Sequence, residues 1–242
     1  MIEVKMETKE GNLITAVNAL RTSLSEELGE GEGFVETFRA FRKSMTLYGC
    51  AIREIRTKFE VLNDELALTG SRNPIKNIYS RVKSPESIFG KMKRKGIPFT
   101  IENMEMVLND IAGVRVVCQY IDDIYTVAAM LGGQDDIAVV SIKDYIKNPK
   151  PNGYRSFHMI VEVPVFFSEE KNIVRVEVQI RTIAMDFWAT LEHGLKYKHQ
   201  IANEKEIVEE LKYCSEKAYD LDVRMQSLKD QIYGKNHSLE KQ

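Results

Sequence analysis

The sequence has few cysteines and no long apolar run, and each shortage excludes a class of protein. Cys50, Cys118 and Cys214 are its three cysteines, and no two of them form a CxxC pair. A zinc ribbon or a dithiol redox centre is therefore excluded, and reduced intracellular thiols are expected. No apolar run approaches the roughly 20 residues that a membrane-spanning helix needs. The first ten residues, MIEVKMETKE, lack the apolar segment of a secretory signal, so we expect a cytoplasmic protein without a membrane partner.

Charge of neither sign predominates in the chain. Its 242 residues include 34 lysines and arginines and 36 acidic residues, for a formal net charge of −2. A protein that binds nucleic acid through its whole surface is usually basic, so the net charge does not support an RNA partner, although one stays possible. Any affinity for phosphate must come from local clusters of cations.

Apolar residues at heptad spacing mark a long helix near each end of the chain. The first stripe runs from Phe38 to Leu66 and stops before Gly70 and Pro74, and the second covers residues 207–232. We expect these helices to pack on the core, on each other or on a partner subunit.

The residues between the two stripes alternate as they do in an α/β domain. Runs rich in β-branched residues predict strands at 111–121, 136–142, 156–165 and 174–182, and helices are predicted at 84–96, 122–133 and from 183 onward. The predicted fold is α/β (α+β), with a mixed, largely antiparallel central sheet of about five strands flanked by helices. We divide the chain into a polar N-terminal segment (1–33), an N-terminal helical region (34–80), a core (81–200) and a C-terminal helix (201–242).

The first candidate site is a basic cluster around the predicted helix 84–96. Ser87, Lys91 and Arg94 share one face of this helix, and Arg81 and Lys83 alternate just before it. A polyphosphate requires several converging cations together with donors at a helix N-terminus, and this segment supplies both. A solvated lysine face is the alternative interpretation.

Two carboxylates form the second candidate site. Asp110 directly precedes the predicted strand that holds Arg115, and Glu177 lies in the strand 174–182 with Gln179 and Arg181 on the same polar face. Taken alone, Asp110 is typical of a turn or cap residue. Glu177 is equally typical of the solvent-exposed face that an antiparallel strand commonly has. If the two carboxylates face each other, they suit Mg²⁺, which takes one or two carboxylates plus phosphate oxygens.

The third candidate site is the loop KNPKPNGYRSFH, between two predicted strands. Gly153 accepts the positive φ of a tight turn, so we expect Tyr154 at the loop tip with its ring available to stack on a nucleobase. Lys150, Arg155 and His158 surround it in sequence. An ordinary connecting loop with a packed tyrosine is the alternative.

The fourth candidate site is the start of the helix predicted from Ile183. Asp186 lies near its N-terminus, where a carboxylate accepts hydrogen bonds from N1–H and the exocyclic amine of guanine, a donor pair that adenine does not present. We expect Phe187, Trp188 and Leu191 to bury into the core.

Four segments in this order resemble the synthetase domain of the RelA/SpoT family: RVKSPESIFGKMKRK, DIAGVRVVCQYIDDI, DYIKNPKPNGYRSFH and VEVQIRTIAMDFWATLEH. The chain is most similar to the stand-alone small alarmone synthetases, and more to the RelP type than to the RelQ type. The resemblance implies a nucleotidyltransferase-like synthetase fold. It also implies a Mg²⁺-dependent transfer of pyrophosphate from ATP to the 3′-hydroxyl of GDP or GTP, which gives (p)ppGpp and AMP in the stringent response.

The resemblance also implies roles for individual residues. Glu177 would deprotonate the attacking hydroxyl and, with Asp110, flank Mg²⁺. The implied ATP-binding residues are Arg81, Lys83, Ser87, Lys91, Arg94 and Arg115. The implied residues for GDP or GTP are Lys150, Tyr154, Arg155, His158, Gln179 and Asp186. At the position of Asp186, members of the RelQ type have Asn, so this sequence departs from their pattern.

The family suggests a homotetramer, and its long members add a hydrolase domain with His-Asp motifs. No histidine of this chain is followed by Asp, so we predict synthesis without hydrolysis. Two alternatives stay open: a catalytically silent module that binds a nucleotide or RNA, and a nucleotidyltransferase that releases pyrophosphate.

Overall fold

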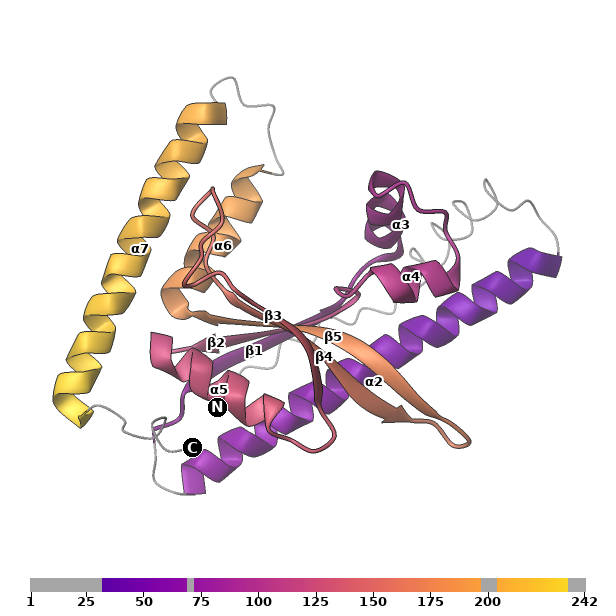
Figure 1. The fold of residues 1–242 in the computed structure, drawn as a ribbon, viewed down its shortest axis with the longest axis horizontal. Coiled ribbons are helices and arrows are strands. Elements are labelled where there is room, and N and C mark those ends of the chain that lie inside the picture. The colour runs from indigo at the N-terminus through magenta and orange to yellow at the C-terminus, as the bar shows by residue number, and fades with distance from the viewer. Residues whose placement is uncertain (1–31, 69–71, 197–203, 235–242) are drawn as a thin grey trace.

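The computed structural model describes residues 32–68, 72–196 and 204–234. Figure 1 shows a central sheet with helices on both of its faces. Most of the predicted polar N-terminal segment lies outside the described residues, and its last two residues begin helix α2 (Glu32–Leu68). In the part of the chain that the structure describes, no helix is both long enough and apolar enough to cross a membrane.

The sheet has five strands in the order β1-β2-β5-β4-β3. Their bounds are β1 (Ile75–Val82), β2 (Ala112–Cys118), β3 (Ala138–Asp144), β4 (Phe157–Phe166) and β5 (Lys171–Thr182). The β2–β5 pair is parallel and the other three pairs are antiparallel, which confirms the predicted mixed, largely antiparallel sheet.

Strand β1 corrects the predicted boundary of the N-terminal helical region. Residues 75–80 were assigned to that region, but they form the first part of this edge strand. Only Ile75 and Ile78 of β1 are buried, and its pairing with β2 contains an irregularity between Ile75 and Asn77. The period-two pattern is therefore broken, because an edge strand with a bulge buries few side chains.

Helix α2 packs along one face of the sheet and confirms the first heptad stripe. Phe41, Ile52, Ile55 and Phe59 are buried in the core. The strand side chains that point to this face include Val114, Val116, Val176 and Val178, all at most 1% exposed. Helix α5 (Ile121–Gly132) lies on the same side of the sheet as α2 (Figure 1).

Two short helices stand at one side of the opposite face, and together they place the residues before β2. Helix α3 (Pro85–Arg94) begins at the predicted cap, Ser84, whose hydroxyl oxygen accepts from the Ser87 backbone N–H. Ile88 and Met92 are buried, so the predicted polar face of this helix points away from the core. Helix α4 (Ile101–Val107), which the sequence did not predict, follows α3 and leads to Asp110.

Helix α6 (Ile183–Lys196) continues directly from β5 at the other side of that face. The Trp188 side chain is buried as expected, and its indole N–H donates to the Leu211 carbonyl oxygen of α7 (Glu204–Tyr233) at 2.7 Å. The expected burial of Phe187 and Leu191 is wrong, because they are 64% and 50% exposed. They lie on the outer face of α6, and only the inner face packs on the sheet and α7.

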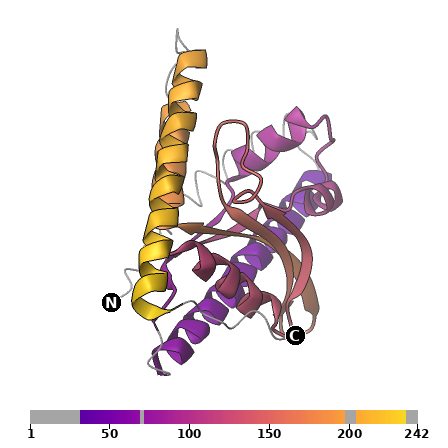
Figure 2. The same cartoon turned by 60° about the vertical axis from the view of Figure 1, so that its left-hand side comes forward.

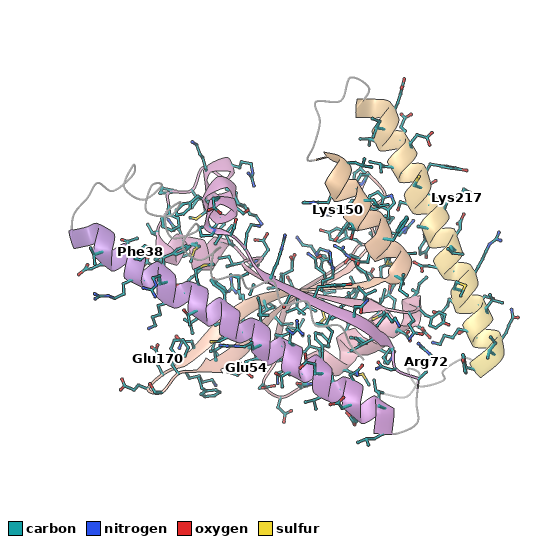
Figure 3. All side chains as sticks on the ribbon, turned by 180° about the vertical axis from the view of Figure 1, so that it is seen from behind. Phe38, Glu54, Arg72, Lys150, Glu170 and Lys217 are labelled. Carbon is teal, nitrogen blue, oxygen red and sulfur yellow. The ribbon has the colours of Figure 1, made fainter. Side chains whose placement is uncertain are left out.

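Helix α7 confirms the second predicted helix, but its apolar stripe points outward. Ser215, Asp222 and Lys229 recur every seven residues and are buried against the rest of the protein. The apolar residues Leu221, Met225, Leu228 and Ile232 are exposed instead. Near the C-terminal end of α7, the Lys229 ammonium pairs with Asp122 and Asp123, which also binds Arg72. Figure 3 labels Arg72 beside this end of the helix.

Candidate active site

A pocket of about 330 Å³ lies on the polar face of the sheet. Four lysines and two carboxylates are among its lining residues: Lys91, Lys95, Lys143, Lys150, Asp110 and Glu177. They come from α3 and the residue after it, from the segment just before β2, from β3 and the β3–β4 loop, and from β5. Because one pocket collects so many cations around two carboxylates, it suits a phosphate-rich ligand together with a metal ion.

Asp110 is held by two of the basic residues that the sequence singled out. Its Oδ2 atom lies 2.7 Å from the ammonium nitrogens of both Lys83 and Lys91. Burial raises the pKa of Asp110, but the hydrogen bonds and charges of the two lysines outweigh burial and hold that pKa below its ordinary value. Its Oδ1 atom is buried and has no hydrogen-bond partner. A carboxylate with one unpartnered buried oxygen can accept a cation.

Glu177 lines the pocket, so part of the polar face of β5 faces this cavity. Its Oε2 accepts a hydrogen bond from the Gln179 amide nitrogen at 2.9 Å, and its Oε1 lies 3.3 Å from the His158 Nδ1 atom. Burial raises the pKa of Glu177, but these two neighbours outweigh burial and keep the pKa below its ordinary value. Glu177 is therefore ionised at neutral pH and can accept a proton.

From His158, which lines the pocket, the polar network continues through Tyr154, Arg181 and Asp186. The Tyr154 hydroxyl lies 2.9 Å from the His158 Nε2 atom and accepts from the Arg181 Nη2 atom at 2.6 Å. Arg181 also donates to the Asp186 Oδ1 atom at 3.2 Å. The predicted guanine reader Asp186 is thus connected to the predicted stacking residue Tyr154 through one buried arginine, which the sequence-based site did not include.

The sequence predicted Tyr154 at the tip of its loop, and this prediction is wrong. The tip is the turn at Gly153, where φ is +87° and the backbone N–H donates to the Lys150 carbonyl oxygen at 2.8 Å. The Tyr154 ring is half-buried and packs against Tyr145, with their centroids 6.1 Å apart. The Lys150 ammonium lies 4.8 Å from the centroid of each of these rings. A base that stacks on Tyr154 would therefore lie beside the Lys150 ammonium as well as the aromatic ring.

Arg115 and the outer basic residues lie apart from the pocket lining. The Arg115 guanidinium carbon is 4.8 Å from the centroid of the Tyr79 ring, and its Nε atom is 3.2 Å from Asp186 Oδ1, an ion pair without hydrogen-bond geometry. Burial lowers the pKa of Arg115, and Asp186 partly offsets that effect. Arg81, Ser87 and Arg94 are exposed on β1 and α3.

Arg155 does not join the other predicted residues for GDP or GTP. Its guanidinium carbon lies 3.9 Å from the centroid of the Tyr219 ring on α7, and its Nη1 atom donates to the Ile146 carbonyl oxygen at 2.8 Å. Neither contact involves a residue of the pocket lining. The structure therefore gives Arg155 a role in holding its loop.

Seven pocket-lining residues were absent from the sequence-predicted site, and they include two lysines and a tyrosine: Lys95, Lys143 and Tyr145. Lys95 belonged to the recognised basic run, and as the C-cap of α3 it follows Lys91 by four residues, which places both lysines on the same side of the helix. Lys143 lies in the edge strand β3, where it pairs with His158 of β4. Only this strand pairing brings Lys143 to the pocket, and the strand's own sequence does not show which strand lies beside it.

Comparison with known proteins gives consistent matches over this region. A family model described as "Region found in RelA / SpoT proteins" matches residues 80–202. The chain is 44% identical to GTP pyrophosphokinase YwaC of Bacillus subtilis over 192 residues, which cover 79% of this chain and 91% of that protein. It is also similar to the crystal structure of small alarmone synthetase 1 from Bacillus subtilis bound to its product pppGpp. That match has a TM-score of 0.73 and 36% identity, and it covers 80% of this chain and 98% of the other.

A structure of the same synthetase bound to AMPCPP is similar as well, with a TM-score of 0.67 and 33% identity over 79% of this chain and 98% of the other. The family match contains strands β2 to β5, the pocket-lining residues and both carboxylates. The matches agree with the order of the four segments from which the resemblance was inferred. This chain therefore belongs to the RelA/SpoT family, in which its relatives include the small alarmone synthetases.

Proposed function

We propose that this protein is a GTP pyrophosphokinase, which transfers the pyrophosphate group of ATP to the 3′-hydroxyl of GDP or GTP. The products are ppGpp or pppGpp and AMP, the alarmones and by-product of the stringent response. The observation that carries the proposal is the joint presence of Asp110 and Glu177 in a pocket that four lysines line. Pure binding of a nucleotide would not require two carboxylates beside its phosphates. ATP and GTP are intracellular nucleotides, which supports the predicted cytoplasmic location.

The ATP half of the site is the basic side around α3. Lys83 and Lys91 converge on Asp110, and the N-terminal turn of α3 presents Ser87 beside them. Such a cluster neutralises and aligns a triphosphate, which is most of what phosphoryl-type transfer demands of a protein. Arg81 and Arg94, both exposed, extend the positive surface, and Arg115 lies near Arg81 across the β1–β2 pair.

The acceptor half is the side formed by the β3–β4 loop and the start of α6. Tyr154 and Lys150 supply an aromatic ring and a cation for the guanosine nucleotide, and Gln179 and His158 flank the Glu177 carboxylate. Asp186 would accept from the guanine edge, in competition with its present partner Arg181. We assign Arg155 to holding the loop, although the resemblance placed it at the acceptor.

In the proposed reaction, the 3′-oxygen of the acceptor attacks the β-phosphorus of ATP. The new bond forms between these two atoms, and the bond from the β-phosphorus to the oxygen that bridges it to the α-phosphorus breaks. AMP leaves with the electron pair of that bond. Glu177 takes the proton of the hydroxyl, and the lysines around Asp110 stabilise the charge on the transferred group.

The two carboxylates fit Mg²⁺, which we propose as the cofactor. Asp110 has a buried oxygen without a hydrogen-bond partner, and Glu177 lines the same pocket. Among the described residues, no cluster of three or more histidine, cysteine or acidic side chains could hold a metal ion alone. The remaining ligands would thus be phosphate oxygens, as is usual for Mg²⁺ in nucleotide sites. When bound, the ion would neutralise charge on the reacting phosphates.

We also propose that the protein assembles as a homo-oligomer, with the family's homotetramer as the expected state. Ile183, Phe187, Leu191 and Leu195 form a stripe on the outer face of α6, and all are at least 50% exposed. The exposed stripe of α7 adds Leu221, Met225, Leu228 and Ile232. Figure 1 shows α6 next to α7, and in Figure 2 α7 stands in front of α6. Large contiguous apolar surfaces of this kind mark protein interfaces.

The test of the proposed function uses ATP labelled at the β-phosphate, incubated with GDP or GTP, Mg²⁺ and the protein. We expect the label in a guanosine product that carries a 3′-pyrophosphate, together with unlabelled AMP. Label in free pyrophosphate would instead identify a nucleotidyltransferase. Label that stays in ATP would identify a silent binding module, which the exposed basic residues of α3 would also suit.

A further inference from the structure

The β3–β4 connection, residues 145–156, is the segment that carries Tyr154 and Lys150, and we call it the acceptor loop. Its base is closed by a hydrogen bond from the Tyr145 backbone N–H to the Ser156 carbonyl oxygen at 3.0 Å. Its tip is closed by a hydrogen bond from the Lys150 backbone N–H to the Tyr154 carbonyl oxygen at 3.1 Å. These bonds set the shape of the loop. They do not set its direction relative to the sheet.

The tip of the acceptor loop rests on helix α7. The Ser215 hydroxyl of α7 donates to the Gly153 carbonyl oxygen, and the Ser215 side chain is only 5% exposed. A Cβ atom at Gly153 would lie 2.7 Å from the Ser215 Cβ and 3.3 Å from the Lys212 Cα. The turn therefore packs against the helix backbone at a distance that only glycine permits, and the positive φ of Gly153 requires glycine as well.

A second contact joins the loop to α7 one turn further along the helix. The Arg155 guanidinium carbon stacks 3.9 Å from the centroid of the Tyr219 ring. Arg155 also donates to the Ile146 carbonyl oxygen at 2.8 Å, so one side chain connects both limbs of the loop to α7. A partly buried cation on an aromatic face is a favourable contact that orients both groups.

Helix α6 contributes a third contact at the tip, where the Asn152 amide nitrogen donates to Glu192 Oε1 at 3.0 Å. Figure 1 shows the loop beside α6, and Figure 3 labels Lys150 on this side of the molecule, with Lys217 on α7. Ser215 and Tyr219 are not among the pocket-lining residues. Any effect that they have on the reaction must pass through the loop.

We infer that Ser215 and Tyr219 of α7 are positioning residues, which hold the acceptor loop so that Tyr154 and Lys150 meet the guanosine nucleotide. The inference rests on the proposed function, because it takes this loop as the binding element for GDP or GTP. A loop that is already held in place loses less conformational entropy when its ligand binds. Loss of the α7 contacts should therefore weaken acceptor binding and leave ATP binding at α3 unchanged.

The test is a set of substitutions in α7 with separate titrations of the two substrates. We expect Tyr219→Ala to raise the KM for GDP about tenfold, equivalent to about 1.4 kcal/mol of binding free energy, with the KM for ATP unchanged. Tyr219→Phe keeps the ring and should restore the wild-type KM. Ser215→Ala should also raise the KM for GDP and leave the KM for ATP unchanged. Lys217→Ala, an exposed change on the same helix, is the matched control.

A calorimetric Kd for GDP, measured on each variant without ATP, gives a second readout that does not depend on turnover. Equal GDP affinity in wild type and Tyr219→Ala would overturn the inference, and so would equal rises in both KM values. Failure of the proposed function gives a different pattern, in which the wild type itself transfers no label and binds no GDP. Circular dichroism identifies any variant that fails to fold, and Ser215→Ala, the smallest change, then decides the question.

Discussion

Asp222 of α7 is a buried carboxyl group whose ionisation should oppose folding, and this prediction can be worked out from its surroundings. The side chain is 6% exposed, and its Oδ2 atom accepts from the buried Thr182 hydroxyl at 2.6 Å. None of the salt bridges among the described residues reaches it. Burial raises the pKa of Asp222 from 3.8 to about 6, and the Thr182 hydrogen bond only partly offsets that rise.

The sign of the effect follows from proton linkage. The folded state holds a proton on Asp222 at pH values where the unfolded state has lost it, so the free energy of unfolding falls as pH rises from about 4 through about 6. The total loss corresponds to about 3 kcal/mol at 1.36 kcal/mol per pKa unit, and roughly 1.4 kcal/mol of it falls between pH 5 and pH 8. Asp222→Asn keeps an acceptor for Thr182 and removes the titration.

The assay is urea unfolding of the wild type and Asp222→Asn at pH 5 and pH 8. We expect the stability of the variant relative to the wild type to increase by roughly 1.4 kcal/mol between these two pH values. Asp220→Asn, an exposed change on the same helix, should show no such increase. Thr182→Val should enlarge the pH dependence, because it removes the hydrogen bond that favours the carboxylate. A difference between wild type and Asp222→Asn that does not change with pH would refute the reasoning.

Three further predictions concern the site and the outer surface. Glu177→Gln should reduce turnover on the order of 10²–10⁴-fold while calorimetry still detects ATP binding, and near wild-type turnover would exclude Glu177 as the general base. Lys91→Met removes one of the two cations on Asp110, so in steady-state titrations it should raise the KM for ATP much more than the KM for GDP. An unchanged KM for ATP would show that Lys91 does not belong to the ATP site. Phe187→Glu places a charge on the exposed α6 stripe and should lower the molar mass in analytical ultracentrifugation, whereas an unchanged mass would place the interface elsewhere.

The sequence predicted most elements whose local pattern is strong. The capped helix around α3, the two long terminal helices and the strands that became β2, β4 and β5 are all present. Strand β1 and helix α4 were missed, because β1 is a weakly alternating edge strand and α4 has only seven residues. In each case the local pattern was too short or too irregular to compete with its neighbours.

Within the site, residue type indicated the chemistry before any geometry was known. The carboxylates Asp110 and Glu177 and the basic cluster were found because their charges stand out against the apolar pattern of their elements. The sequence could not show that Arg155 turns away to Tyr219, that Arg181 links Tyr154 to Asp186, or that Lys143 joins the pocket. These placements depend on which strands pair and on which helix lies behind a loop.

By itself, therefore, the sequence determined the fold class through its local periodicity. The resemblance of four of its segments to the RelA/SpoT family indicated the type of reaction. Tertiary structure decided the rest. It turned the apolar stripe of α7 outward and buried Ser215, Asp222 and Lys229 in its place. It also seated the acceptor loop on that polar face. A heptad pattern shows that a helix has two different faces, but only the packing of distant segments determines which face is buried.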